Sequence, residues 1–347
     1  MDEQTPKSRS RATADMVART ANVSRVAVSR AFNAHASIKP EKRDRILKIA
    51  QELNYTPDIA ARSLVTRRSH LVGVIVPDVC SPWESQEIDR LTTALQAEGF
   101  ATLLFKTRTD RSMDSDLLTY MKGYNPDSII AFTENVGPEI LGQMFDRATP
   151  IYVTYPHAPD LADAANAPRT FDRLEVIQRD GIDQAIALMQ GYGAKRIAYL
   201  AGDPHASVSA EREMVLRQVM AARGLAEPVI IPGDFTYDAA FAATIDLFRV
   251  GDGTDAVFAA NDVGAFGVID ALRHELRLRV PEDVMVVGFD DISQASWKSY
   301  NLTTVKIDLD ERVRALVRLI LRRLKNPVAP PLSETVRTKL VVRGTVG

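Results

Sequence analysis

Residues 13–33 hold the side chains whose types and spacing are most suggestive of chemistry. Ala18, Asn22 and Val28 have the spacing of a helix–turn–helix: a small residue where two helices cross, a turn residue and a β-branched core residue. In this motif the second helix enters the major groove of DNA with its N-terminal residues at the base edges. The pattern therefore predicts DNA binding; the alternative is a small helical hairpin used only for packing.

The start of the second expected helix holds the side chains that would contact DNA. Arg25 can pair with guanine through two hydrogen bonds, and Val26 can pack on a thymine methyl group. Ser24 and Ser29 carry hydroxyl groups that suit phosphate oxygens, and Arg30 follows one turn further along. We therefore expect base readout and phosphate contacts from this one helix.

Three short helices would have to position these side chains. Thr13 can cap a helix that runs to about residue 20, and Ser24 can cap a second one over residues 25–32. A proline at a first helical position opens a third helix over residues 40–53. The polar residues 1–11 before them are expected to be a disordered tail.

The charge of the chain is unevenly distributed. The 347 residues include 43 Lys and Arg and 45 Asp and Glu, which gives a net charge of −2. Residues 1–70 alone hold 14 basic and 7 acidic residues, a net charge of +7, whereas the remainder has a net charge of −9. A basic head on an acidic body indicates nucleic acid at that end only. An ordinary solvated surface is the alternative explanation.

From residue 71 onward, short apolar runs alternate with amphipathic segments. The runs lie at residues 71–76, 101–105, 128–132, 151–153, 196–200, 229–231, 256–260 and 284–288. Helical patterns occupy residues 85–98, 181–190, 210–223, 263–275 and 310–324. Apolar strands separated by helices predict parallel sheets that are covered on both faces. We expect two doubly wound domains, with 303–307 and 335–342 as crossovers; a (β/α)8 barrel is the alternative.

Several function classes lack their sequence signals. The single Cys80 excludes an internal disulfide framework and a cysteine-cluster metal site. There is no apolar run of membrane-spanning length, and the N-terminus has no secretory h-region. No phosphate-binding loop, dinucleotide fingerprint or zinc-protease motif is present, and the five histidines show no ligand spacing. We therefore expect a cytoplasmic protein that is not an enzyme and has neither a metal nor a cofactor.

A second motif, Tyr55-Thr-Pro57 followed by Ala61-Arg-Ser-Leu64, resembles the LacI/GalR family of transcriptional regulators when taken with the helix–turn–helix. In that family this stretch is a hinge helix that orders on operator DNA, and a leucine at the position of Leu64 wedges between central base pairs. An apolar wedge of this kind bends the duplex toward further contacts. The resemblance adds four residues to the expected DNA-binding set: Thr13, Asn33, Tyr55 and Ala61. Lys39 and Asp58 depart from the family's usual serine and asparagine.

The body is similar to the effector domain of the same family, which shares the fold of periplasmic sugar-binding proteins. The matching segments are residues 72–77, 81–83, 196–202, 260–262, 287–291, 302–305 and 342–345. The resemblance implies a ligand pocket between two subdomains. It also implies a homodimer that binds a pseudo-palindromic operator, because symmetric heads bind symmetric half-sites.

The expected pocket contains groups suited to a carbohydrate. Arg212 can donate to vicinal hydroxyls, Asp290 can accept from them, and Asn261 can do both. Trp83 and Trp297 follow strand ends, where ligands bind in open α/β sheets, and an indole face can stack on a sugar ring. Glu84 and Tyr155 complete the expected effector-binding set. At these two positions many members of the family have an aromatic residue and an aspartate, respectively.

These patterns together predict an effector-controlled repressor. The expected organisation is a disordered tail at 1–11, a helix–turn–helix domain at 12–56, a hinge at 57–69 and an effector domain at 70–347. The effector domain would divide into an N-subdomain, about 70–176 with 307–334, and a C-subdomain, about 177–306 with 335–347. A free-standing cytoplasmic sugar-binding protein and a sugar-processing enzyme are the alternatives.

Overall fold

The computed structural model describes residues 12–33, 36–57, 68–76, 79–107, 115–132, 141, 145, 149–153, 172–251 and 253–347. The chain divides into two compact units, Met1–Ser69 and His70–Gly347. Most of the expected hinge, with Ala61 and Leu64, and the expected pocket residue Tyr155 lie outside the described residues. Their roles therefore stay predictions.

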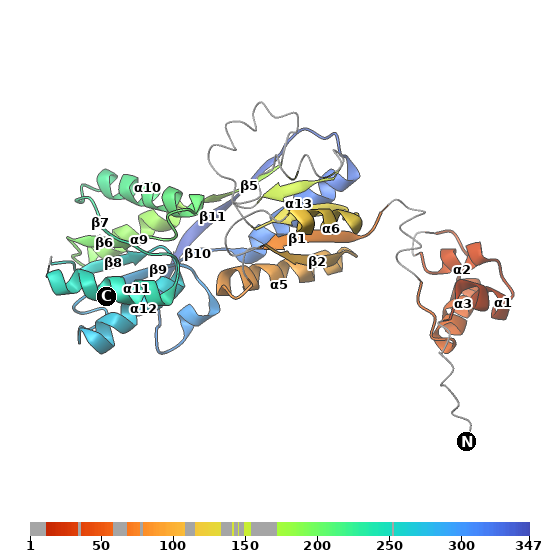
Figure 1. Ribbon diagram of the computed structural model, residues 1–347, viewed down its shortest axis with the longest axis horizontal. Helices are drawn as coiled ribbons and strands as arrows, with labels where there is room; N and C mark the ends of the chain where they lie inside the picture. Colours follow the sequence, from red (N-terminus) through yellow and green to blue (C-terminus); the bar gives the residue numbers. More distant parts are fainter. Residues whose placement is uncertain are drawn as a thin grey trace, which may run out of the picture. The chain divides into compact units, whose positions relative to one another are not determined.

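The first unit contains the expected helices α1 (Ala14–Thr20), α2 (Arg25–Ala31) and α3 (Pro40–Glu52) (Figure 1). The caps are formed as expected: the Met16 amide donates to the Thr13 hydroxyl, and the Ala27 amide donates to the Ser24 hydroxyl. Lys39, at the N-cap of α3, makes no side-chain capping bond.

A small apolar core holds the three helices together. Val17 of α1, Val28 of α2 and Ile46 of α3 are each at most 1% exposed. Asn22 adopts the left-handed conformation (φ 49°) that the tight turn between α1 and α2 requires. The structure thus confirms the helix–turn–helix.

Two separate sheets form the second unit, which confirms the doubly wound architecture over the barrel. The first has the order β2-β1-β3-β4 and is parallel throughout. Its strands are β1 (Leu71–Val76), β2 (Ala101–Lys106), β3 (Ser128–Ala131) and β4 (Ile151–Val153). One apolar cluster joins β1 to α5 (Pro82–Ala97) and α13 (Leu309–Lys325), and another joins the sheet to α6 (Ser115–Gly123).

The second sheet has the order β5-β11-β10-β9-β8-β6-β7 and is parallel except for the pairing of β10 with β11. Its strands are β5 (Arg173–Ile177), β6 (Ile197–Leu200), β7 (Val229–Ile231), β8 (Ala256–Ala259), β9 (Met285–Asp290), β10 (Thr303–Ile307) and β11 (Ser333–Val341). The helices around it are α9 (Arg179–Gly191), α10 (Ser207–Ala222), α11 (Tyr237–Val250) and α12 (Asp262–Asp270), which a π-helical turn (Ala271–Glu275) continues; a short 3-10 helix covers Ser293–Ser296.

Candidate nucleic-acid interface and effector site

The outward face of α2 carries the five residues expected to contact DNA. Ser24, Arg25, Val26, Ser29 and Arg30 are all exposed, whereas the two residues between Val26 and Ser29 are buried in the head core. Val26 is 59% exposed, so an apolar group is presented to solvent beside an arginine. This combination suits a surface that contacts both base methyl groups and base edges.

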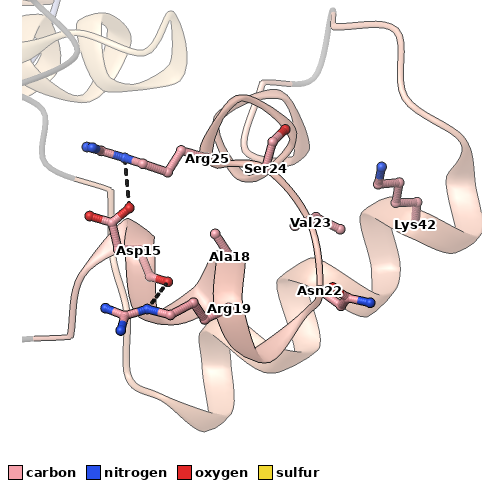
Figure 2. Close-up of a pocket in the computed structure, with 8 residues that line it drawn as sticks. All are labelled: Asp15, Ala18, Arg19, Asn22, Val23, Ser24, Arg25 and Lys42. Carbon is pink, nitrogen blue, oxygen red and sulfur yellow. Dashed lines mark hydrogen bonds and ion pairs between the residues drawn. The ribbon is translucent and has the colours of Figure 1, made fainter.

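A groove lies beside the start of α2 (Figure 2). An ion pair crosses part of it, with Arg25 Nε 3.2 Å from Asp15 Oδ1. Arg19 Nε donates to the backbone oxygen of Asp15 over 3.4 Å. The residues that line the groove are Asp15, Ala18, Arg19, Asn22, Val23, Ser24, Arg25 and Lys42.

The other expected DNA-binding residues of the head have structural contacts as well. Thr13 is exposed and caps α1. The Asn33 side chain is exposed, and its backbone oxygen accepts from Arg43 Nη2 over 3.0 Å. Tyr55 packs edge-on against Phe32, with the ring centroids 5.7 Å apart. Tyr55 therefore also helps to close the head core.

The expected effector site centres on Arg212, which projects from α10 and is 5% exposed. Its Nε donates to Gln178 Oε1 over 2.8 Å, and its Nη1 donates to the backbone oxygen of Ala260. The guanidinium carbon lies 3.6 Å from the centroid of the Phe289 ring. Residues at the ends of β5, β8 and β9 therefore hold one guanidinium in place.

Asp290 ends β9 beside this guanidinium and has a left-handed backbone (φ 116°), which is strained for a residue other than glycine. Burial raises the pKa of its carboxyl well above the ordinary value, and the charges of Asp262 and Glu84 add to the increase, whereas Arg212 opposes it. A carboxyl held this way can accept hydrogen bonds from hydroxyl groups, or donate one while it is protonated.

Asp262 fixes the loop that follows Asp290. Its buried carboxylate accepts a hydrogen bond from the Thr304 hydroxyl over 2.5 Å and another from the Ile292 amide over 2.9 Å. Burial raises the pKa of Asp262 to about 7. Asp262 was not among the expected site residues, and its part is to hold the end of β9 rather than to face a ligand.

Asn261 is engaged in holding the same edge of the sheet. Its Oδ1 accepts the Gly264 amide as the N-cap of α12, and its Nδ2 donates to the Phe235 backbone oxygen, each over 2.9 Å. Phe235 itself packs so close to Gly202 that a Cβ there would lie 2.1 Å from the ring. Phe235 is a partly buried aromatic residue at the strand ends that the sequence patterns missed.

The remaining three expected pocket residues differ in location. Trp83, at the start of α5, is 8% exposed and belongs to an apolar cluster made mostly of residues from the second sheet and the helices around it. Glu84 follows it, accepts the Ser81 hydroxyl and is close enough to raise the pKa of Asp290. Trp297 is 56% exposed, in the loop after the 3-10 helix. The structure thus brings Arg212, Asp290 and Glu84 near one another, uses Asn261 to hold the neighbouring loop, and presents Trp297 to solvent.

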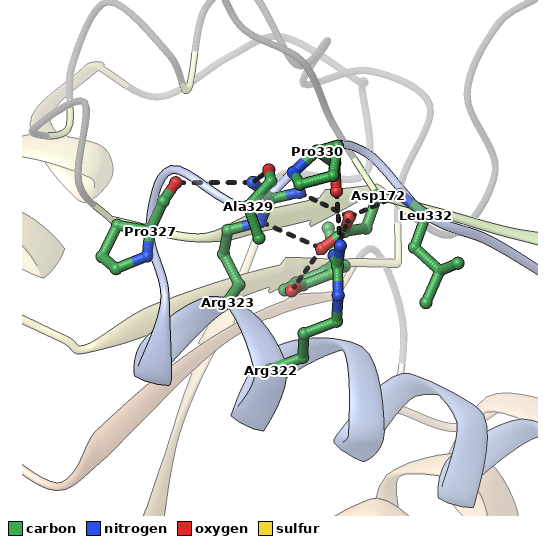
Figure 3. Close-up of polar contacts among 8 residues, drawn as sticks. Asp172, Arg322, Arg323, Pro327, Ala329, Pro330 and Leu332 are labelled. Atoms are coloured by element: carbon green, nitrogen blue, oxygen red, sulfur yellow. Dashed lines mark hydrogen bonds and ion pairs between the residues drawn. The ribbon is translucent and has the colours of Figure 1, made fainter.

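Asp172, just before β5, is bound to the C-terminal end of α13 (Figure 3). Its carboxylate, which is 1% exposed, pairs with Arg322 Nη1 over 3.1 Å and with Arg323 Nη2 over 2.5 Å. It also accepts the Leu332 amide over 2.9 Å. Asp172 precedes β5 and Leu332 precedes β11. These contacts therefore hold the first residues of both strands against the C-terminal end of α13. A displacement of α13 would therefore reach both strands.

Within the described residues, no group of three or more His, Cys, Asp or Glu side chains could hold a metal ion. None of the helices in the described part of the chain is long and apolar enough to cross a membrane.

Two family models match separate parts of the chain. A family model described as bacterial regulatory proteins, lacI family, matches residues 14–58, and one described as a periplasmic binding protein-like domain matches residues 188–346. The HTH-type transcriptional regulator CelR of Thermobifida fusca is 31% identical over 345 residues, which cover 96% of this chain and 98% of that protein. Its name describes a DNA-binding regulator rather than an enzyme.

Solved structures give the same result. The structure titled transcriptional regulator CelR–cellobiose complex is 26% identical, with a TM-score of 0.66, and the match covers 96% of this chain and all of that one. The lac repressor dimer bound to operator and the anti-inducer ONPF has a TM-score of 0.77 at 21% identity, covering 96% and 99% of the two chains. At that identity the second match supports the shared fold.

Proposed function

Since the chain belongs to the lacI family of bacterial regulatory proteins, we propose that it is a repressor that binds a pseudo-palindromic operator as a homodimer and responds to a carbohydrate effector. It is a DNA-binding transcriptional regulator. The observation that carries the proposal is the capped helix α2, which exposes Arg25 and Val26, on a chain that matches CelR over nearly its whole length.

The proposed DNA contacts divide into two groups. Arg25 and Val26 contact base edges, because they lie at the N-terminal end of α2. Contacts to the DNA backbone come from polar residues around them, and the hinge contributes a wedge. The backbone and hinge residues are Thr13, Ser24, Ser29, Arg30, Asn33, Tyr55, Ala61 and Leu64.

The proposed effector site lies at the strand ends of the second sheet, between the expected subdomains. Arg212 donates to ligand hydroxyls and Asp290 accepts from them. A carbohydrate is favoured because a structure of CelR contains cellobiose. Cellobiose is therefore the first ligand to test. The other residues proposed for the site are Trp83, Glu84, Tyr155, Asn261 and Trp297.

We also propose that the protein acts in the cytoplasm and has no catalytic activity of its own. A repressor needs access to chromosomal DNA, and the curated relative named above is described as a regulator. Purified protein incubated with cellobiose should return the sugar unchanged. Hydrolysis or phosphorylation of the sugar would instead support the sugar-processing alternative.

Two measurements test the proposal. A thermal-shift screen with cellobiose, other disaccharides, monosaccharides, sugar phosphates and nucleosides should find a carbohydrate that raises the unfolding midpoint, because a ligand of the folded state stabilises it. Selection from a library of randomised duplexes should return a two-fold symmetric sequence. Light scattering at micromolar concentration should give the mass of a dimer, and a monomer would contradict the symmetric assembly.

A further inference from the structure

The carboxylate of Asp15 faces the arginine to which we assign base readout. Arg25 Nε lies 3.2 Å from Asp15 Oδ1, and the two side chains remain 70% and 48% exposed. Asp15 comes from the first turn of α1 and Arg25 is the first residue of α2, so the ion pair joins the two helices of the motif (Figure 2). An ion pair this exposed adds little to the stability of the fold.

The sign of the Asp15 charge is unfavourable for DNA binding in general. Among the described residues that line the groove, Asp15 is the acidic one, and Arg19, Arg25 and Lys42 are basic. DNA phosphates attract these three cations and repel a carboxylate, so Asp15 lowers the affinity for any duplex. Asp15 also lies in the first turn of α1, where a carboxylate favours the helix. That role needs no partner side chain, so the ion pair with Arg25 calls for its own explanation.

The geometry of the pair indicates what that effect is. The contact is made through Nε of Arg25, which leaves the terminal Nη1 and Nη2 groups for another partner. Guanine presents two acceptors, O6 and N7, and an arginine binds them through two parallel hydrogen bonds. Holding the side chain in one rotamer before binding reduces the entropy lost when those bonds form.

We propose that Asp15 is a positioning residue for base recognition. It holds the Arg25 guanidinium ready for one guanine in each half-site and so increases discrimination against the other three bases, at the expense of affinity for random DNA. The inference rests on the proposed readout by Arg25, and its test must separate the two.

The test is selection from a library of randomised duplexes with the full-length chain and four variants. The variants are Asp15→Asn, Arg25→Ala, the double variant of these two, and Asp44→Asn. Asp44 is an exposed acid of α3 in the same unit, so Asp44→Asn removes the same charge without touching the pair. Thermal unfolding of each variant checks that the head remains folded.

Asp15→Asn should lower the preference for guanine at one position of each half-site by about two- to fivefold, the range that an exposed ion pair can supply, and leave the other positions unchanged. Its affinity for random duplex should rise. Asp44→Asn should keep the guanine preference. On the Arg25→Ala background, Asp15→Asn should change nothing further at that position, because the pair is already broken.

Two outcomes would contradict the account, and they are distinguishable. If Arg25→Ala abolishes the preference but Asp15→Asn keeps it, or lowers every position equally as simple charge removal would, the positioning inference is wrong. If Arg25→Ala leaves the preference intact, the proposed readout by Arg25 fails, and the inference fails with it.

Discussion

The guanidinium of Arg212 lies face-on to the Phe289 ring, 3.6 Å from its centroid, and Asp290 is the next residue of β9. Gln178 Oε1 and the backbone oxygen of Ala260 accept from two of its nitrogens. The cation is thus fixed from three sides before any ligand arrives. A site preorganised in this way spends little binding energy on ordering its own groups.

Asp290→Asn should weaken carbohydrate binding while leaving operator affinity unchanged. The amide has the shape of the carboxyl but replaces one of its oxygens with an NH2 group, so the ligand hydroxyls lose an acceptor, and a hydrogen bond is worth about 0.5–1.5 kcal/mol. Calorimetric titration with cellobiose measures the first effect, and anisotropy on the selected duplex measures the second. Asp283→Asn, at an exposed acid of the same unit, is the control. Full-strength binding by Asp290→Asn would place the effector elsewhere.

The buried acids give the free energy of unfolding an unusual pH dependence. Burial raises the pKa of Asp262 from 3.8 to about 7 and also raises that of Asp290. In the unfolded chain these two carboxyls ionise at about pH 4, a lower pH than in the folded protein. The stability that the two groups contribute is therefore present below about pH 4 and is lost as the pH rises through their folded-state pKa values. We expect the free energy of unfolding to fall between about pH 4 and pH 7.

Urea unfolding at several pH values checks this dependence. Asp290→Asn removes one of the two titrating carboxyls, so the free energy of unfolding should depend less steeply on pH. In contrast, Arg279 lowers the pKa of Asp283 to about 2, so Asp283→Asn should change the slope only below pH 4. A parent protein that becomes more stable across the pH 4–7 window would contradict the assignment.

The buried ion pair between Glu87 of α5 and Arg312 of α13 should behave as a unit. The two side chains are at most 1% exposed, with Arg312 Nε 2.5 Å from Glu87 Oε1. Glu87→Gln leaves a buried cation without its counter-ion, which typically costs about 3–5 kcal/mol. The double variant Glu87→Leu with Arg312→Met should recover much of that loss in urea unfolding. A double variant less stable than Glu87→Gln would show that packing, not charge, dominates.

Leu64→Ala tests the hinge at a residue that lies outside the described part of the chain. The variant should bind the operator more weakly but keep its fold and its dimer mass, because the wedge acts only on bound DNA. The loss should be largest on duplexes whose central step is stiff, since bending them costs more. Equal affinity of parent and variant on every duplex would remove Leu64 from the mechanism.

Local signals explain why the head was predictable from sequence. The caps Thr13 and Ser24 and the turn residue Asn22 each act within a few residues, so their pattern specifies where the helices begin and end. The apolar runs specified most strands in the same way. Strand β5 was missed because its exposed and half-buried residues alternate, without a fully buried apolar run.

The site was harder to predict because its contacts join distant parts of the chain. Arg212, on α10, is held by Gln178, which lies 34 residues earlier in the chain, and by Phe289 of β9. No spacing rule connects these three positions. Phe235 lacked any local motif. Trp297 was singled out by its residue type and its place after a strand, and neither feature indicates that the side chain is largely exposed.

The most direct test of the account is a titration of full-length protein onto the selected duplex, with and without the carbohydrate that raises its unfolding midpoint. Coupling between two sites is typically worth about 1–3 kcal/mol, so the ligand should change operator affinity by about 5- to 150-fold. Asp290→Asn should bind the duplex normally and lose the change. A ligand that stabilises the parent protein but leaves operator affinity unaltered would contradict effector control.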